Sequence, residues 1–251
     1  SKGIGRCYAL QLAELGYNVL MVSLTISDLA KTATEVAKVN NKVWVRYLCK
    51  DMATMTAAEE LFAWTEQEGI KIDVLINNAG IFSFCDILNT PIERIERIIL
   101  LHDMTATKMC RIYAEDMAKR GGGYILNMSS YSIWMPYPGL SLYSASKAYL
   151  KSFSVAFSKE VREKGIYVTA ICPAGIATDL YGLSPDLQRF GVKTGILMTP
   201  QSCARRSLNA LWRKRRCKVP DWWFRLFIPI CQILCGAPMR WLRNYTMKFQ
   251  K

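Results

Sequence analysis

Short apolar runs alternate with longer stretches of helical spacing along most of this chain, and the alternation constrains its fold more than any other feature. The apolar runs, rich in residues that favour strands, cover positions 18–22, 42–48, 73–77, 124–128 and 167–172. The stretches with helical spacing cover positions 6–15, 28–39, 57–68, 91–119 and 144–164. Strands that are apolar throughout are buried on both faces, which is typical of parallel sheets.

Helices that connect parallel strands cross over the sheet in one hand and cover both of its faces. We therefore predict an α/β fold, a doubly wound, Rossmann-like parallel sheet with helices on both faces. Its first strand would lie before Ser1 and is missing from this chain. The length of 251 residues suits a single domain, residues 1–251, and no linker-like run divides it.

Composition excludes several classes of protein. Apolar residues make up 51% of the chain and charged residues 21%, as in globular proteins. The nine cysteines are scattered and include no Cys-x-x-Cys pair, so neither a metal site nor a disulfide framework is expected. The chain has no run of 18 uncharged apolar residues, so a membrane-spanning helix is not expected. These features predict a cytoplasmic protein without a metal.

The C-terminal region is strongly basic. Residues 201–251 contain twelve Lys and Arg residues and one acid, Asp221, which accounts for most of the net charge of +13. The run Arg213–Arg216 precedes the aromatic residues Trp222 and Trp223, with Trp241 further on. Basic and aromatic residues together suit peripheral contact with an anionic membrane surface. A solvated face or a packed helix explains them equally well, and nucleic acid is disfavoured because no recognition module accompanies the charge.

Four segments have the composition of a ligand crevice at the carboxyl ends of strands. The first, Ser1-Lys2-Gly3-Ile4-Gly5, opens a helix, where free N–H groups attract a phosphate. The others follow later strands and comprise Asp51, Asn77 with Ala79 and Gly80, and the segment containing Pro173, Ile176 and Thr178. Each loop taken alone is explained as readily by a tight turn or a helix cap.

Tyr143 and Lys147 are four residues apart, so on a helix they share one face. A phenol ionises near pH ~10, and a neighbouring ammonium lowers that pKa. Ser130 lies thirteen residues before Tyr143, where its hydroxyl could bind the same substrate oxygen. Such a group could exchange a proton with a carbonyl or an alcohol. A surface Tyr and Lys on a helix remains the plainer alternative for this pair alone.

Taken together, these motifs resemble the short-chain dehydrogenase/reductase family from Ser1 to about Asp179. The resemblance implies that Tyr143 is the general acid/base, that Lys147 lowers its pKa and binds the nicotinamide ribose, and that Ser130 holds the substrate oxygen. It implies a dinucleotide site formed by Ser1, Lys2, Gly3, Ile4, Gly5, Asp51, Asn77, Ala79, Gly80, Tyr143, Lys147, Pro173, Ile176 and Thr178.

The resemblance extends loosely to hydroxysteroid dehydrogenases and to long-chain 3-oxoacyl or 3-ketosphinganine reductases. It implies a small hydrophobic ketone or alcohol as substrate, with residues 180–251 forming a substrate lid and the basic extension. The family commonly forms dimers or tetramers through two long helices, here residues 91–119 and 144–164. We therefore expect a homo-oligomer.

Two positions depart from the family pattern. His102 stands where the family usually has an Asn that completes a proton relay, so it either holds a water molecule or is simply packed. Leu24 stands where NADPH-preferring relatives often carry Arg. Because Lys2 could meet a 2′-phosphate, we favour NADP(H), with NAD(H) compatible. These departures also keep a catalytically weak, dinucleotide-binding sensor as an alternative.

Overall fold

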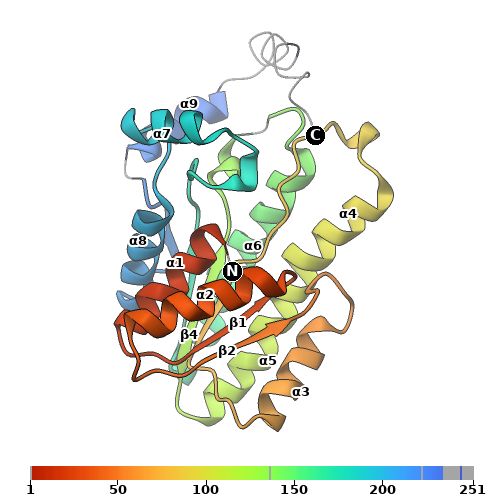
Figure 1. Cartoon of the computed structure of the whole chain (residues 1–251). Coiled ribbons are helices and arrows are strands. Elements are labelled where there is room, and N and C mark those ends of the chain that lie inside the picture. The colour runs from red at the N-terminus through yellow and green to blue at the C-terminus, as the bar shows by residue number, and fades with distance from the viewer. Residues whose placement is uncertain (1, 136, 222, 234–243, 245–251) are drawn as a thin grey trace.

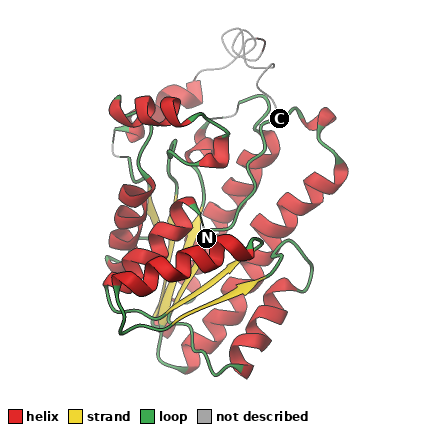
Figure 2. Ribbon diagram, viewed as in Figure 1, coloured by secondary structure: helices red, strands yellow, loops and turns green. Residues whose placement is uncertain are grey.

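The computed structural model describes residues 2–135, 137–221, 223–233 and 244. Parallel strands lie between layers of helices, as Figures 1 and 2 show. The strands are β1 (Val19–Ser23), β2 (Val45–Cys49), β3 (Val74–Asn77), β4 (Gly123–Met128), β5 (Ile166–Ile171) and β6 (Cys217–Lys218). Every pair of neighbouring strands is parallel, which confirms the predicted α/β fold. The two-residue strand β6, within the basic region, was not predicted.

Nine helices of the described chain cover the sheet and its carboxyl end. They are α1 (Gly3–Glu14), α2 (Ile26–Val39), α3 (Ala57–Gln67), α4 (Ile92–Ile99), α5 (Ala106–Lys119), α6 (Ser141–Glu160), α7 (Pro185–Lys193), α8 (Pro200–Trp212) and α9 (Phe224–Ile233). Short 3₁₀ turns include η3 (Tyr131–Trp134) and η5 (Asp179–Tyr181). Helix α8 begins at Pro200, and Thr199 is its N-cap, with its side chain accepting a hydrogen bond from the Ser202 N–H.

The long helix predicted over residues 91–119 is wrong in one respect. A π-helical segment, Leu100–Thr105, separates α4 from α5. A π segment accommodates an extra residue per turn, and it rotates the helix faces before and after it relative to one another. Apolar spacing gave no sign of this segment, which contains His102.

Hydrogen bonds divide the strands into two groups. One contains β2 and β1, and the other contains β3, β4, β5 and β6 in that order. Within the described residues no strand lies between β1 and β3. This arrangement, with β1 and β2 in one group and β3 to β6 in the other, is that of a doubly wound parallel sheet.

Neighbouring side chains on the central strands point to opposite faces and feed two apolar clusters. Leu126 and Ile171 pack with helices α1 and α8 on one face. Ile125 and Val168 pack with α3 and α5 on the other. Burial on both faces fixes the register of β4 and β5, and so fixes where their carboxyl ends place Ser130 and Pro173.

Candidate active site

One cavity opens at the carboxyl ends of the strands. It is lined by every described residue that the sequence analysis assigned to a site. These are Lys2, Gly3, Ile4, Gly5, Asp51, Asn77, Ala79, Gly80, His102, Ser130, Tyr143, Lys147, Pro173, Ile176 and Thr178. Ser1, Trp222 and Trp241 lie outside the described residues.

Helix α6 presents Tyr143 and Lys147 to the cavity from one face, one turn apart. Both are buried, with 6% and 4% of their surfaces exposed. The Lys147 Nζ donates a hydrogen bond of 3.1 Å to the Met128 carbonyl and lies 5.8 Å from the centre of the Tyr143 ring. The Ser130 hydroxyl, at the end of β4, is hydrogen-bonded to the Tyr143 phenol. Residues of α6 and of the end of β4 are thus brought together.

Burial governs the protonation of this group. It raises the pKa of the Tyr143 phenol, and the hydrogen bond from Ser130 opposes the rise. Burial also lowers the pKa of Lys147 to about 8, against the attraction of Asp103. The expected lowering of the Tyr143 pKa by Lys147 is not found: burial is the main cause of its shift, and Ser130 is the group that opposes it. Tyr143 therefore carries its proton at neutral pH and is ready to donate it to a carbonyl oxygen.

His102 is completely buried, and both of its ring nitrogens have protein partners. Its Nε2 accepts a hydrogen bond of 2.9 Å from the Ile81 N–H, so the neutral ring carries its proton on Nδ1. Nδ1 lies 2.9 Å from the Ser146 hydroxyl, which donates to the Tyr143 carbonyl. Burial, helped by Lys147, lowers the His102 pKa to about 2. This geometry favours a packed, positioning residue, and the water-holding role stays a prediction.

The π segment also brings Asp103 close to the site, which the sequence did not indicate. Burial raises the pKa of this carboxyl to about 6, and the positive charge of Lys147 opposes the rise. Its Oδ1 is buried and has no hydrogen-bond partner among the described residues. Asp103 is therefore the carboxyl group whose charge interacts with that of Lys147.

The glycine loop at the start of α1 leaves room for a ligand at a free helix end. Gly3 has a φ of +51°, and a Cβ there would lie 3.2 Å from the Thr178 methyl group. A Cβ on Gly5 would lie 2.9 Å from the Asn78 amide, a residue that the sequence analysis left out of the site. No side chain caps the helix, so its first N–H groups are free. An anionic pyrophosphate fits such an end.

Charged residues surround the far end of the same cavity. Lys2 forms an ion pair of 3.1 Å with Asp28, and Asp51 forms one of 3.0 Å with Arg97. Asp51 also accepts a hydrogen bond of 2.8 Å from the Ala53 N–H in the turn before α3, whose N-cap is Thr56 rather than Asp51. Asp28 was missed because it lies on α2, twenty-six residues from Lys2 in the chain.

The end of β3 and the loop after it contact both the core and the cavity. The Asn77 amide donates to Asn127, which donates to Ser154, each at 2.8 Å. This side chain therefore ties β3 to β4 and α6, and its predicted contact with a dinucleotide is left untested. Gly80 keeps the cavity open, since a Cβ there would lie 3.1 Å from the His102 Nε2 and 3.4 Å from the Lys147 Nζ.

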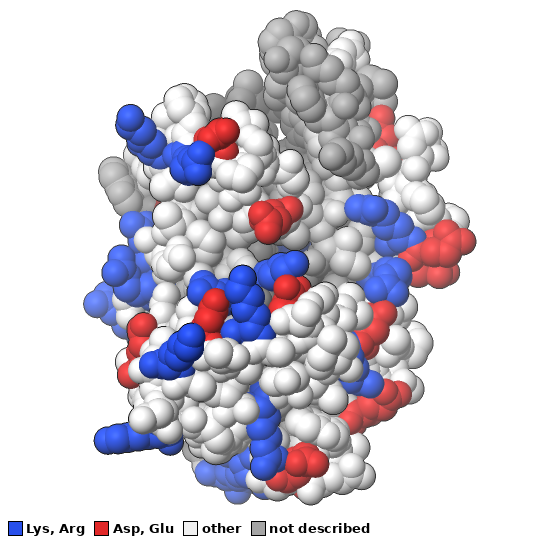
Figure 3. Space-filling view, in the orientation of Figure 1, with Lys and Arg blue, Asp and Glu red and all other residues white. Residues whose placement is uncertain are grey.

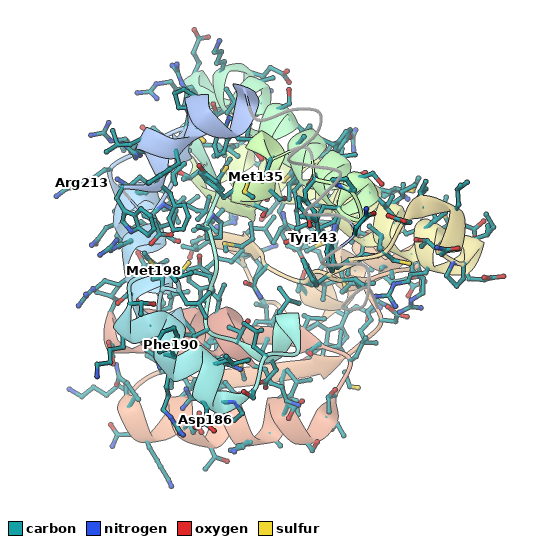
Figure 4. The ribbon with its side chains drawn as sticks, turned by 90° about the horizontal axis from the view of Figure 1, so that it is seen from above. Met135, Tyr143, Asp186, Phe190, Met198 and Arg213 are labelled. Atoms are coloured by element: carbon teal, nitrogen blue, oxygen red, sulfur yellow. The ribbon has the colours of Figure 1, made fainter. Side chains whose placement is uncertain are left out.

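The segment after β5 closes the opposite wall. The Pro173 carbonyl accepts a hydrogen bond of 2.8 Å from the Tyr131 N–H, and Ile176 is paired with Met198. Beyond Thr178 the chain enters η5 and α7. Figure 4, seen from above, places Phe190 of α7 and Tyr143 of α6 on two sides of this end of the molecule.

Comparison with known proteins identifies the class that this fold and site define. A family model described as short chain dehydrogenase matches residues 1–186. The chain belongs to this family. Among the described residues no group of three potential metal ligands is found, and no helix is long and apolar enough to cross a bilayer.

Two curated relatives show which members it resembles. The very-long-chain 3-oxoacyl-CoA reductase of Pyricularia oryzae is 33% identical over 170 residues, covering 67% of this chain and 51% of the relative. The 17-beta-hydroxysteroid dehydrogenase type 3 of Danio rerio is 33% identical over 198 residues, covering 76% of this chain and 63% of the relative. This chain thus spans about half to two thirds of their lengths.

A solved structure supports the fold. The short-chain dehydrogenase from Sphingobium yanoikuyae in complex with NADPH has a TM-score of 0.78 and 24% sequence identity with this chain. The match covers 98% of this chain and 90% of the other. At this identity the likeness concerns the arrangement of strands and helices.

Proposed function

We propose that this protein is an oxidoreductase that interconverts a ketone and a secondary alcohol with a nicotinamide dinucleotide. The observation that carries the proposal is the buried group of Ser130, Tyr143 and Lys147, which faces the same cavity as the glycine loop. A proton donor and an uncapped helix end within one cavity suit hydride transfer coupled to proton transfer.

In the reducing direction Tyr143 donates its phenolic proton to the carbonyl oxygen of the substrate. Ser130 holds that oxygen through its hydroxyl, and Lys147 stabilises the phenolate that forms. The nicotinamide ring supplies or takes up the hydride when it is bound. Lys2, Gly3, Gly5 and Thr178 would hold the dinucleotide. His102 holds Ile81 and Ser146 in place around these groups.

For the cofactor we favour NADP(H) over NAD(H). Lys2 is the cation that the cavity offers at the glycine loop, and 68% of its side chain is exposed, although it pairs with Asp28. Asp28 acts against this preference, because its carboxylate suits the ribose hydroxyls of NAD(H). Fluorescence titration with both dinucleotides tests the preference, and tighter binding of NADH would overturn it.

For the substrate we favour a hydrophobic ketone, steroid-like or with a long chain. Apolar side chains gather near the opening, with Leu180 on the cavity wall and Phe190 of α7 63% exposed. Phe82 contacts the Tyr143 ring edge to face, with their centres 5.1 Å apart. The two curated relatives are named for a very-long-chain 3-oxoacyl-CoA and for a 17-beta-hydroxysteroid, which are both hydrophobic molecules.

Substitution of Tyr143 by Phe separates an enzyme from a sensor. Tyr143→Phe removes the proton donor and keeps the ring, so turnover of NADPH with steroid or long-chain 3-oxo substrates should fall about 10²- to 10⁴-fold. Dinucleotide binding, measured by fluorescence, should stay close to wild type. Wild-type protein that binds the dinucleotide but oxidises it with none of these substrates would favour the catalytically weak sensor.

We also propose peripheral contact with an anionic membrane surface. Residues Arg213–Arg216 are exposed, and Leu226 of α9 is 67% exposed beside Arg225. Figure 3 shows basic side chains along the edge where α8 lies in Figure 1. Sedimentation with phosphatidylserine vesicles tests this contact, because charge-driven binding must weaken as salt is added. The predicted homo-oligomer and cytoplasmic location stay predictions.

A further inference from the structure

Two cysteines that the proposed reaction does not use lie side by side at the end of the sheet. Cys172 follows the last residue of β5, and Cys217 begins β6. Their sulfur atoms are 3.9 Å apart, although 45 residues separate them in the chain. The strands that carry them are hydrogen-bonded, since the Cys172 N–H donates to the Lys218 carbonyl at 2.9 Å. The two thiols are therefore held together by the fold.

The two thiols differ in access and in reactivity. Cys172 is fully buried, whereas Cys217 is partly exposed. The contact with Cys172, together with the charges of Lys151 and Arg225, lowers the pKa of Cys217 below its ordinary value. Burial and the same contact raise the pKa of Cys172. Cys217 is thus the thiol that solvent reaches and that ionises first, as a nucleophile must.

We propose that Cys172 and Cys217 form a reversible oxidation site that closes to a disulfide on reaction with a hydroperoxide. The Cys217 thiolate attacks the terminal oxygen of the peroxide, which breaks the O–O bond, forms a sulfenic acid and releases an alcohol or water. The Cys172 sulfur then attacks the Cys217 sulfur, forming the S–S bond and releasing water. The two thiols lose two electrons and two protons, and the hydroperoxide accepts them.

The site is connected to the dinucleotide cavity through short contacts. The Cys172 sulfur is within hydrogen-bonding reach of the Ser129 hydroxyl, which donates to the Lys147 carbonyl at 2.7 Å. Cys172 also directly precedes Pro173, which lines the cavity. Drawing the Cys172 sulfur toward Cys217 moves it away from Ser129. We expect oxidation to weaken NADPH binding by about threefold, a size typical of coupling between packed neighbours.

Intact-mass and peptide-map measurements on the full chain test the proposal directly. Wild type treated with hydrogen peroxide should lose the mass of two hydrogen atoms and yield one linked peptide that contains Cys172 and Cys217. A thiol reductant should reverse the change. The Cys217→Ser variant should form no such link, and Cys217→Ala serves as a second variant if the first folds poorly.

Cys49→Ser is the matched control, because Cys49 is an exposed thiol on β2. This variant should still form the Cys172–Cys217 link and show the same loss of NADPH affinity. Recovery of Cys172 as a free thiol after peroxide treatment, with Cys217 oxidised alone or linked elsewhere, would overturn the assignment. A link that forms without changing NADPH affinity would overturn the coupling to the cavity. The mass readout needs no turnover, so it is independent of the proposed enzyme activity.

Discussion

Asp103 carries a carboxyl group in surroundings that favour its neutral form. Its pKa rises from 3.8 to about 6 on folding, mainly through burial. Between these values the folded protein binds more protons than the unfolded chain, so stability falls as pH rises through this window. Asp103→Asn removes the free-energy cost of ionising this buried carboxyl group. We expect the free energy of unfolding at pH 7.5 to increase by about 1 to 2 kcal/mol, allowing for partial solvent screening. Urea denaturation measures it.

The gain from Asp103→Asn should shrink at pH 4.5 and vanish below the unfolded pKa of Asp. His102 acts in the opposite direction, because its folded pKa of about 2 lies below the ordinary value of 6.5. Its contribution is present above pH 6.5 and is lost as pH falls. The difference between variant and wild type isolates Asp103. Asp186→Asn is the control, since Asp186 is an exposed residue on α7 and its replacement should change little. An equal gain in both variants would contradict the argument.

At the scale of elements, two glycines let β4 and β5 begin side by side. Gly122 has a φ of +135°, and a Cβ there would lie 2.4 Å from the Gly165 carbonyl oxygen. Gly122→Ala therefore combines an unfavourable backbone conformation with a steric clash, and should lower the free energy of unfolding by more than about 2 kcal/mol. Gly16 has a φ of +87°, and a Cβ there would have no atom within 4 Å. Gly16→Ala should therefore lower the free energy of unfolding by only about 1 kcal/mol. Equal losses in urea denaturation would show that the close approach is unimportant.

The sequence predicts relations within one element, and it does not predict contacts that depend on how elements pack together. Tyr143 and Lys147 were placed correctly on one face because four residues make about one helical turn, a local relation. The parallel strands followed from their continuous apolar character. Asp103 was missed because its approach to Lys147 depends on the π segment and on packing between helices. The contact between Cys172 and Cys217 likewise depends on β6, which is too short to leave a pattern.

At the scale of the whole molecule, the cavity has walls from both groups of strands. Ser23 at the carboxyl end of β1 and Asn77 at the carboxyl end of β3 both line it. A dinucleotide in this cavity would contact both groups of strands, so it would bind the folded protein and not the unfolded chain. At a concentration of about 100 times its Kd it should add about 2.7 kcal/mol to the free energy of unfolding. For a chain of this size that corresponds to a Tm increase of roughly 5 to 10 °C.

A thermal-shift series with NADPH and NADH measures this effect, and NADPH should give the larger shift at equal concentration. The Tyr143→Phe variant should keep the shift, because it loses a proton donor and no part of the dinucleotide loop. Gly5→Val should lose it, since even a Cβ at Gly5 lies 2.9 Å from the Asn78 amide and the larger side chain fills the loop. A full shift in Gly5→Val would mean that the dinucleotide stabilises the protein from somewhere other than the helix α1 end of this cavity.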